Sequence, residues 1–354
     1  MKKRVWLRLG KSALFCFGLV LVLGVAGYVY AIGFKLDELP TADPQTEPAD
    51  LVYLRSAVPT SRGRVLAVVT STGSNPNTGK RTGYELTELS RAYYVFVANG
   101  YEVDIASPLG GEPPMVLDDG LVEADHAFLN DPAAKRKLKN SLSLSAIDPN
   151  DYAAVYFVGG KGTLFDFPEN IDIQRITSAI YVAGGVVSAV CHGPAALVNV
   201  TLDNGSPLLQ GKRVTAFTND EELFLTKDAR TVFPFLLQDA LSAKAAQFIE
   251  GDIYLDNTVV DGRLVTGQNP WSTWATAEAV ILALGHVPVA RERSTEELAV
   301  GVLQRYYRDG VAAARQARMK APDVDRRLIL MHAVVAGMQA RWSDAWQFQK
   351  LARP

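Results

Sequence analysis

Short runs of apolar residues alternate with longer stretches of mixed polarity between residue 64 and about residue 286. A short run that is rich in β-branched residues is typical of a strand buried on both faces of a sheet. A helical segment at 84–99, which closes at Gly100, lies between the first two strands. The order strand, loop, helix, strand predicts an α/β fold with a parallel central sheet. The predicted strands lie at residues 64–70, 101–107, 152–158 and 186–190.

The longest apolar run comes before this pattern, at residues 12–34, and carries no charge. As a helix it would span about 35 Å, against a hydrocarbon core of about 30 Å. We expect residues 1–35 to form a basic flank and a transmembrane helix. A cleaved signal peptide is the alternative, although its apolar region is usually only about 7 to 15 residues long. The basic residues before the run and the acidic residues after it predict a single-pass protein of the inner or cell membrane, with its main domain outside the cytoplasm.

Residues 36–62 contain four prolines and several acidic residues, a composition typical of an extended linker. We expect the folded domain at 63–288. Residues 289–354 begin with the capping-box pair Ser294 and Glu297, and apolar residues then recur every three or four positions. They predict a helical carboxyl-terminal extension of about two helices in its last part. This extension has no chemical signature and is expected to serve as packing surface or as the interface of a homo-oligomer.

Composition and charge narrow the functional classes. Hydrophobic residues make up 48% of the 354-residue chain and charged residues 21%, which indicates a globular protein. The net charge of -2 offers no basic stripe, so nucleic acid is not an expected partner. The histidines outside the elbow described next lack the paired spacing of zinc ligands, so no metal is expected. Cys16 and Cys191 lie in unrelated segments, and no intramolecular disulfide is expected between them.

The strongest chemical signal is Cys191, which ends the apolar run at 186–190 and precedes His192, Gly193 and Pro194. This order predicts a strand, a tight turn and the start of a helix, with the thiol at the bend. A helix amino terminus favours the thiolate over the thiol, so the arrangement is that of a nucleophile elbow with sulfur in place of oxygen. A buried structural cysteine is the alternative, which the adjacent histidine and the Gly-Pro turn disfavour.

Five motifs occur in order along the predicted domain. They are RTGYELTEL at 81–89, GGKGTLFDFP at 159–168, AVCHGPAAL at 189–197, VTAFTNDEE at 214–222 and DGRLVTGQNP at 261–270. Together they resemble the glyoxalase III-like branch of the superfamily that also contains the Parkinsonism-associated deglycase and the PfpI proteases. The resemblance implies a flavodoxin-like α/β sandwich of the class I glutamine amidotransferase-like fold, and it covers about residues 64–286.

The resemblance implies a catalytic cysteine, histidine and acid. It maps the nucleophile to Cys191, its neighbour to His192 and the acidic partner of the thiol to Glu88. It places the third member of the triad at Glu222, although the acids at 220–221 leave the register open.

The same resemblance places an oxyanion-binding turn at Gly159 and Gly160, which we expect to contact the substrate together with Lys161. Many relatives have histidine at the position of Lys161. The lysine therefore departs from the family pattern and is expected to change the charge of the substrate pocket.

The function implied is a cysteine-dependent hydro-lyase of the glyoxalase III type. It would convert methylglyoxal and related 2-oxoaldehydes to 2-hydroxy acids such as D-lactate through a hemithioacetal on Cys191, with no cofactor. Protein deglycation is expected as a further activity of the same thiol. The expected partners are a small aldehyde and the membrane. Two alternatives use the same cysteine: a stress-responsive holdase or redox sensor, and a cysteine amidase or peptidase.

Overall fold

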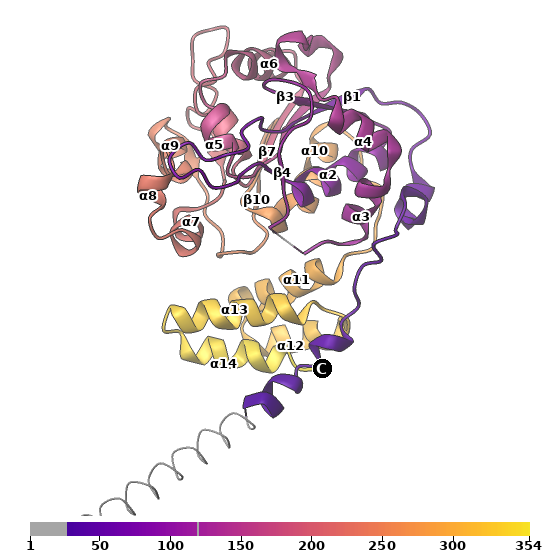
Figure 1. The fold of residues 1–354 in the computed structure, drawn as a ribbon, viewed down its shortest axis with the longest axis vertical. Helices are drawn as coiled ribbons and strands as arrows, with labels where there is room; N and C mark the ends of the chain where they lie inside the picture. The colour runs from indigo at the N-terminus through magenta and orange to yellow at the C-terminus, as the bar shows by residue number, and fades with distance from the viewer. Residues whose placement is uncertain (1–26, 119) are drawn as a thin grey trace, which may run out of the picture. The chain divides into compact units, whose positions relative to one another are not determined.

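The structure is a computed structural model that describes residues 27–118 and 120–354 (Figure 1). Two compact units are present. The larger runs from Thr41 to Glu292, and the smaller joins the segment that ends at Pro40 to Arg293–Pro354. The boundaries expected at 35, 62 and 288 stay a prediction.

A seven-stranded sheet lies at the centre of the larger unit, with the strand order β10-β11-β7-β6-β1-β3-β5. Every neighbouring pair is parallel except β10 and β11. The predicted α/β fold with a mostly parallel central sheet is confirmed. The strands are β1 Arg64–Val68, β3 Glu102–Ser107, β5 Leu142–Ser143, β6 Ala154–Phe157, β7 Val186–Val190, β10 Thr258–Asp261 and β11 Leu264–Gly267. Two further pairs, β2 Tyr84–Glu85 with β4 Met115–Val116 and β8 Arg213–Val214 with β9 Gln247–Phe248, lie outside this sheet.

Both faces of the sheet are covered by other parts of the chain. Since successive side chains of a strand point to opposite faces, neighbouring residues of one strand pack against different elements. In β6, the Tyr156 ring lies 5.5 Å from that of Phe96 in α2, whereas the next residue, Phe157, packs 5.8 Å from Phe167 on the opposite face. The β6 and β7 strands are buried throughout, as their apolar composition predicts. The helices of this unit are α2 Leu86–Ala98, α3 Glu123–Asn130, α4 Pro132–Lys139, α5 Thr163–Asp166, α6 Ile171–Val182, α7 Asn219–Leu225, α8 Ala229–Val232, α9 Leu237–Ala243 and α10 Thr273–Ala283 (Figure 1).

The smaller unit is helical, which confirms the predicted helical carboxyl-terminal region. Its helices are α11 Thr295–Asp309, α12 Val311–Lys320, α13 Arg326–Met338 and α14 Trp342–Leu351 (Figure 1). The Ser294–Glu297 capping box forms at the start of α11, as its spacing predicts.

One feature of this unit differs from the sequence expectation. The apolar pattern in its last part continues through Met338, Trp342 and Trp346, but these side chains are exposed. The chain breaks between α13 and α14, where Ala340 has a left-handed φ of 58°. Alanine is rarely left-handed, and the sequence therefore contains no signal for this break.

The membrane prediction needs correction. No helix within 27–118 and 120–354 is long and apolar enough to cross a membrane. This finding contradicts the predicted single-pass membrane localisation with an extracytoplasmic domain. Residues 12–26 of the predicted span lie outside the described residues. At its described end, the Tyr30 hydroxyl donates to Gln349 Oε1 at 2.7 Å, and Phe34 is buried against protein.

The segment expected to be an extended linker contains three short 3₁₀ helices, at Leu36–Glu38, Pro48–Asp50 and Val52–Ser56. Within the larger unit, the Asn130 amide donates to the Pro44 and Thr46 carbonyl oxygens at 2.8 and 2.9 Å. Part of the segment is therefore attached to the α/β unit by specific hydrogen bonds.

Candidate active site

Cys191 follows the last residue of β7 and adopts a left-handed φ of 57°. Such a backbone is uncommon for a residue with a side chain and costs about 1–3 kcal/mol, so the surrounding structure must hold it. The Cys191 N–H donates to the Gly267 carbonyl at 2.9 Å, and its own carbonyl accepts from the Phe217 N–H at 2.9 Å. The chain thus turns sharply at the thiol, as the elbow prediction requires.

The helix after the elbow is shorter than expected. Only the 3₁₀ helix Gly193–Leu197 follows, with Pro194 in its first turn. A Cβ atom on Gly193 would overlap the Phe157 carbonyl oxygen, which explains why glycine stands there. A helix dipole of one short turn gives limited support to a thiolate.

His192 lies between the thiol and a carboxylate. Its Nδ1 is 3.2 Å from Cys191 Sγ, and its Nε2 is 2.6 Å from Glu222 Oε2. All three side chains are nearly buried, with 4% of Cys191 and 3% of His192 exposed. The Phe217 ring packs on the imidazole, with the ring centroids 4.6 Å apart. A carboxylate on one ring nitrogen orients the imidazole so that its other nitrogen faces the sulfur.

Of the three consecutive acids at 220–222, Glu222 is the one that contacts His192. Glu222 reaches His192, Glu221 points to other partners, and Asp220 is exposed. Burial acts to raise the pKa of Glu222, but His192, through its charge and hydrogen bond, and then Lys161 outweigh it and lower the pKa. The carboxyl group therefore favours its ionised form beside the imidazole.

Glu88 lies in the first turn of α2 and is buried, whereas an ordinary helix-surface acid would be exposed. Its Oε2 accepts a hydrogen bond from the Gly159 N–H at 2.8 Å. A Cβ on Gly159 would lie 2.5 Å from that oxygen and 2.9 Å from the Cys191 Cβ. Only glycine lets the carboxylate and the elbow approach each other so closely.

The turn at Gly159 and Gly160 is held by its neighbours. Gly160 has a φ of 101°, and a Cβ there would lie 2.7 Å from the Tyr84 Cα. Among the residues that the structure describes, the Gly160 and His192 N–H groups donate to no other protein group. Lys161 Nζ lies 6.0 Å from the centre of the Phe233 ring. The two N–H groups have the chemistry of an oxyanion site.

Sequence reasoning missed several side chains that support the site. The Thr163 hydroxyl contacts the Gly160 and His192 carbonyl oxygens at 2.8 and 3.0 Å and so joins the turn to the elbow. The Tyr156 hydroxyl donates to the Glu88 carbonyl at 3.0 Å, and burial, then Glu88 and Cys191, raise its pKa well above the ordinary value. Neither residue lies in a pattern that identifies such a role, although Thr163 falls within the glycine-rich motif.

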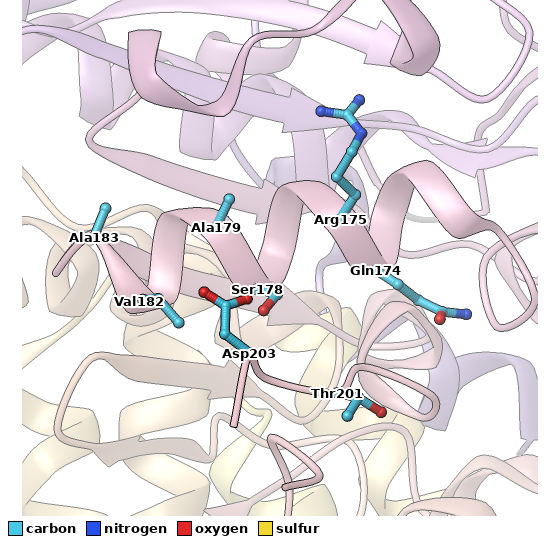
Figure 2. A pocket seen from close by; sticks show the side chains of 8 residues that line it. All are labelled: Gln174, Arg175, Ser178, Ala179, Val182, Ala183, Thr201 and Asp203. Carbon is cyan, nitrogen blue, oxygen red and sulfur yellow. The ribbon is translucent and has the colours of Figure 1, made fainter. Parts of the chain in front are cut away.

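A pocket elsewhere on the α/β unit contains none of the predicted site residues. Figure 2 shows it beside α6, where Arg175 is engaged with Asp172 and with the carbonyl oxygens of Leu144 and Ile147. It is lined by Gln174, Arg175, Ser178, Ala179, Val182, Ala183, Thr201 and Asp203 (Figure 2). Because its one cation is already satisfied by protein oxygens, this pocket has no chemistry comparable to that of the elbow.

The fold and the site together define an α/β protein with a buried cysteine at a sharp turn after a central strand, where histidine lies between the thiol and a glutamate. The comparisons with known proteins agree with this class. The family model described as DJ-1/PfpI matches residues 80–283, and the chain belongs to the DJ-1/PfpI family. The family resemblance seen in the sequence is confirmed.

Two curated relatives and one solved structure show how far the similarity extends. Glyoxalase 3 of Candida albicans is 38% identical over 214 residues, which cover 58% of this chain and 91% of the relative. The glutathione-independent glyoxalase HSP31 of Saccharomyces cerevisiae is 36% identical over 217 residues, which cover the same shares. The crystal structure of glyoxalase III from Candida albicans covers 62% of this chain and 97% of its own, with a TM-score of 0.58 and 36% identity.

Proposed function

We propose that this chain is a glutathione-independent glyoxalase of the glyoxalase III type. It would convert methylglyoxal and related 2-oxoaldehydes to 2-hydroxy acids. The observation that carries the proposal is the Cys191–His192–Glu222 chain of contacts, with the Glu88 carboxylate held on Gly159 beside the same thiol. Relatives that share this region are named glyoxalases, which supports the same activity here.

In the first step, the Cys191 thiolate adds to the aldehyde carbon and forms a hemithioacetal. A negative charge develops on the aldehyde oxygen as the carbon–sulfur bond forms. The N–H groups of Gly160 and His192 are suited to stabilise this oxygen, because they donate to no other group among the described residues.

The second step moves a proton between the two substrate carbons. A base removes the hydrogen from the former aldehyde carbon to give an enediol, and an acid then protonates the adjacent carbon. The product is a thioester on Cys191, which water hydrolyses to the 2-hydroxy acid and the thiol. We assign Glu88 and His192 to these transfers, and Glu222 to orienting the imidazole. His192 Nδ1 lies 3.2 Å from the sulfur, and the Glu88 carboxylate is held on Gly159, the residue that faces the Cys191 Cβ.

The substrate is expected to be small. Because Cys191 and His192 are nearly buried, a three-carbon aldehyde can reach the sulfur with less rearrangement than a glycated protein side chain. We assign Lys161, with Gly159 and Gly160, to the substrate-binding turn. Its cation influences Glu222 and would favour a polar or anionic group on the substrate.

Lactate formation tests this function. The purified chain, incubated with methylglyoxal in buffer without any thiol, should form lactate, which a stereospecific lactate dehydrogenase measures. A chain that forms no lactate from methylglyoxal or other 2-oxoaldehydes, but suppresses the aggregation of a client protein or hydrolyses amide substrates, would support the holdase or amidase alternative instead.

A further inference from the structure

Glu221, next to the triad acid, is a fully buried carboxylate with many donors. Its Oε2 accepts from the Thr218 N–H at 3.0 Å and from the Thr218 hydroxyl at 3.1 Å, which closes the capping box of α7. Its Oε1 accepts from the Tyr254 N–H at 2.8 Å and from the side-chain amides of Gln268 at 3.1 Å and Asn269 at 2.9 Å. One carboxylate thus joins three separate segments of the chain.

These segments connect α7 to the strand beside the elbow. Gln268 and Asn269 directly follow β11, whose last residue, Gly267, accepts the Cys191 N–H. Glu221 therefore attaches α7 to the same strand end that holds the thiol. The next residue in α7 is Glu222, which contacts His192.

Tyr254 contacts Glu221 through both its backbone and its side chain. Its N–H donates to Glu221 Oε1, and its hydroxyl donates to the Glu221 carbonyl at 3.0 Å. It has a left-handed φ of 56°, which is unfavourable for a bulky aromatic residue. A conformation of this kind persists only where the surrounding contacts impose it. The two bonds to Glu221 are such contacts.

We propose that Glu221 and Tyr254 are positioning residues that hold α7 in the register in which Glu222 meets His192. A helix that rotated or slid by one residue would move Glu222 off the imidazole, since successive side chains are about 100° apart around a helix of 3.6 residues per turn. The five hydrogen bonds to the Glu221 carboxylate oppose this rotation, and the Tyr254 hydroxyl fixes the backbone at the same point. The role rests on the triad assigned under the proposed function, but not on the identity of the aldehyde.

The test measures the reactivity of Cys191 directly. The full chain and its Glu221→Gln, Tyr254→Phe and Asp220→Asn variants are treated with iodoacetamide across pH 5–9, and mass spectrometry follows alkylation of Cys191. The charged groups that face the thiol or its histidine are Glu88, Glu222 and Lys161, and all are retained in every variant. Melting temperature and the circular dichroism spectrum report whether each variant is folded.

We expect Glu221→Gln to shift the alkylation profile to higher pH and to lower kcat about 10-fold or more with little change in KM, because His192 loses its orientation. Tyr254→Phe removes one hydrogen bond and should shift the profile in the same direction by a smaller amount. At a given pH below the midpoint, we expect the alkylation rate of Cys191 to fall by about 2- to 10-fold. Asp220→Asn, an exposed acid in the same turn, should match the wild-type chain.

The outcomes separate a positioning role from a merely structural one. A folded Glu221→Gln chain that melts earlier but keeps the wild-type alkylation profile would overturn the inference. If Glu221→Gln does not fold, the folded Tyr254→Phe chain decides in its place, and an unchanged profile overturns the inference. Alkylation needs no aldehyde, so a wild-type chain that makes no lactate would refute the proposed function without affecting this test.

Discussion

Two regions of the molecule differ in the burial of their side chains. One is the elbow region of the α/β unit, and the other is the face formed by α13 and α14 in the helical unit. At the elbow, Cys191 and His192 are nearly buried, and His192 contacts both the Cys191 thiol and the Glu222 carboxylate. On α14, Trp342 and Trp346 are 71% and 50% exposed. Both regions contain a left-handed residue, Cys191 at the elbow and Ala340 between α13 and α14, so burial rather than backbone strain separates them. Substitutions should therefore have large effects at the buried elbow and small effects on the exposed helical face.

The largest effect should come from the proposed proton shuttle. Glu88→Gln keeps the shape of the side chain but removes the base, and general acid–base groups contribute about 10² to 10⁴ in rate. We expect kcat for lactate formation to fall by about this factor, with a smaller change in KM. Steady-state kinetics with methylglyoxal check this. Asp344→Asn in α14 is the control, and near-normal turnover in Glu88→Gln would transfer the shuttle role to another group.

Paired glycine substitutions compare the packing at the elbow with the packing of another helix, α11, in the helical unit. In Gly159→Ala the new Cβ would meet Glu88 Oε2 at 2.5 Å, and overpacking of this kind costs about 1–3 kcal/mol in the free energy of unfolding. In Gly301→Ala, within α11, no atom lies within 4 Å of the new Cβ. That change should stabilise its helix by up to about 1 kcal/mol. Urea unfolding measures the free energy of unfolding of both variants. Equal changes in the two variants would contradict the expectation that the elbow is packed more tightly than α11.

The pH dependence of stability should carry the signature of the triad. The pKa of Glu222 is lowered in the folded chain, so its contribution is present above its unfolded value of about 4.5 and is lost as the pH falls through the folded value. Burial outweighs the hydrogen bonds of Glu221 and raises its pKa, so its contribution is lost as the pH rises instead. Urea unfolding between pH 3 and 7 should show a shallower acid loss in Glu222→Gln than in the wild-type chain. Parallel curves would argue against an ionised Glu222.

The smallest effect is expected on the exposed helical face. Trp342→Ser removes an exposed side chain, and such surface changes usually alter stability by less than about 0.5 kcal/mol. Lactate formation should be unchanged. A loss of soluble protein or a change in sedimentation would instead show that this face is covered by another chain in solution.

Features that depend on one local stretch of sequence could be predicted. The apolar runs identified the buried parallel strands, and the run that ends at Cys191 predicted the elbow, because both signals lie within one local stretch. The family motifs placed Glu88 and Glu222, which sequence spacing alone would not have joined to Cys191. Their catalytic roles stay predictions.

What could not be predicted depends on contacts between distant segments or on rare backbone states. The donors to Glu221 come from residues 218, 254, 268 and 269, and no local pattern brings them together. The break between the last two helices depends on a left-handed alanine, which propensity does not foresee. The membrane prediction rested on hydropathy alone, whereas two side chains at the described end of that run contact or are buried by protein.

The central claim is that the Cys191 thiol performs glyoxalase chemistry without glutathione. Its most direct test is the rate of lactate formation from methylglyoxal by the wild-type chain and by a folded Cys191→Ala chain, at equal concentration and without added thiol. We predict lactate formation by the wild-type chain and a rate at the uncatalysed background for Cys191→Ala. Equal rates in the two chains would contradict the account.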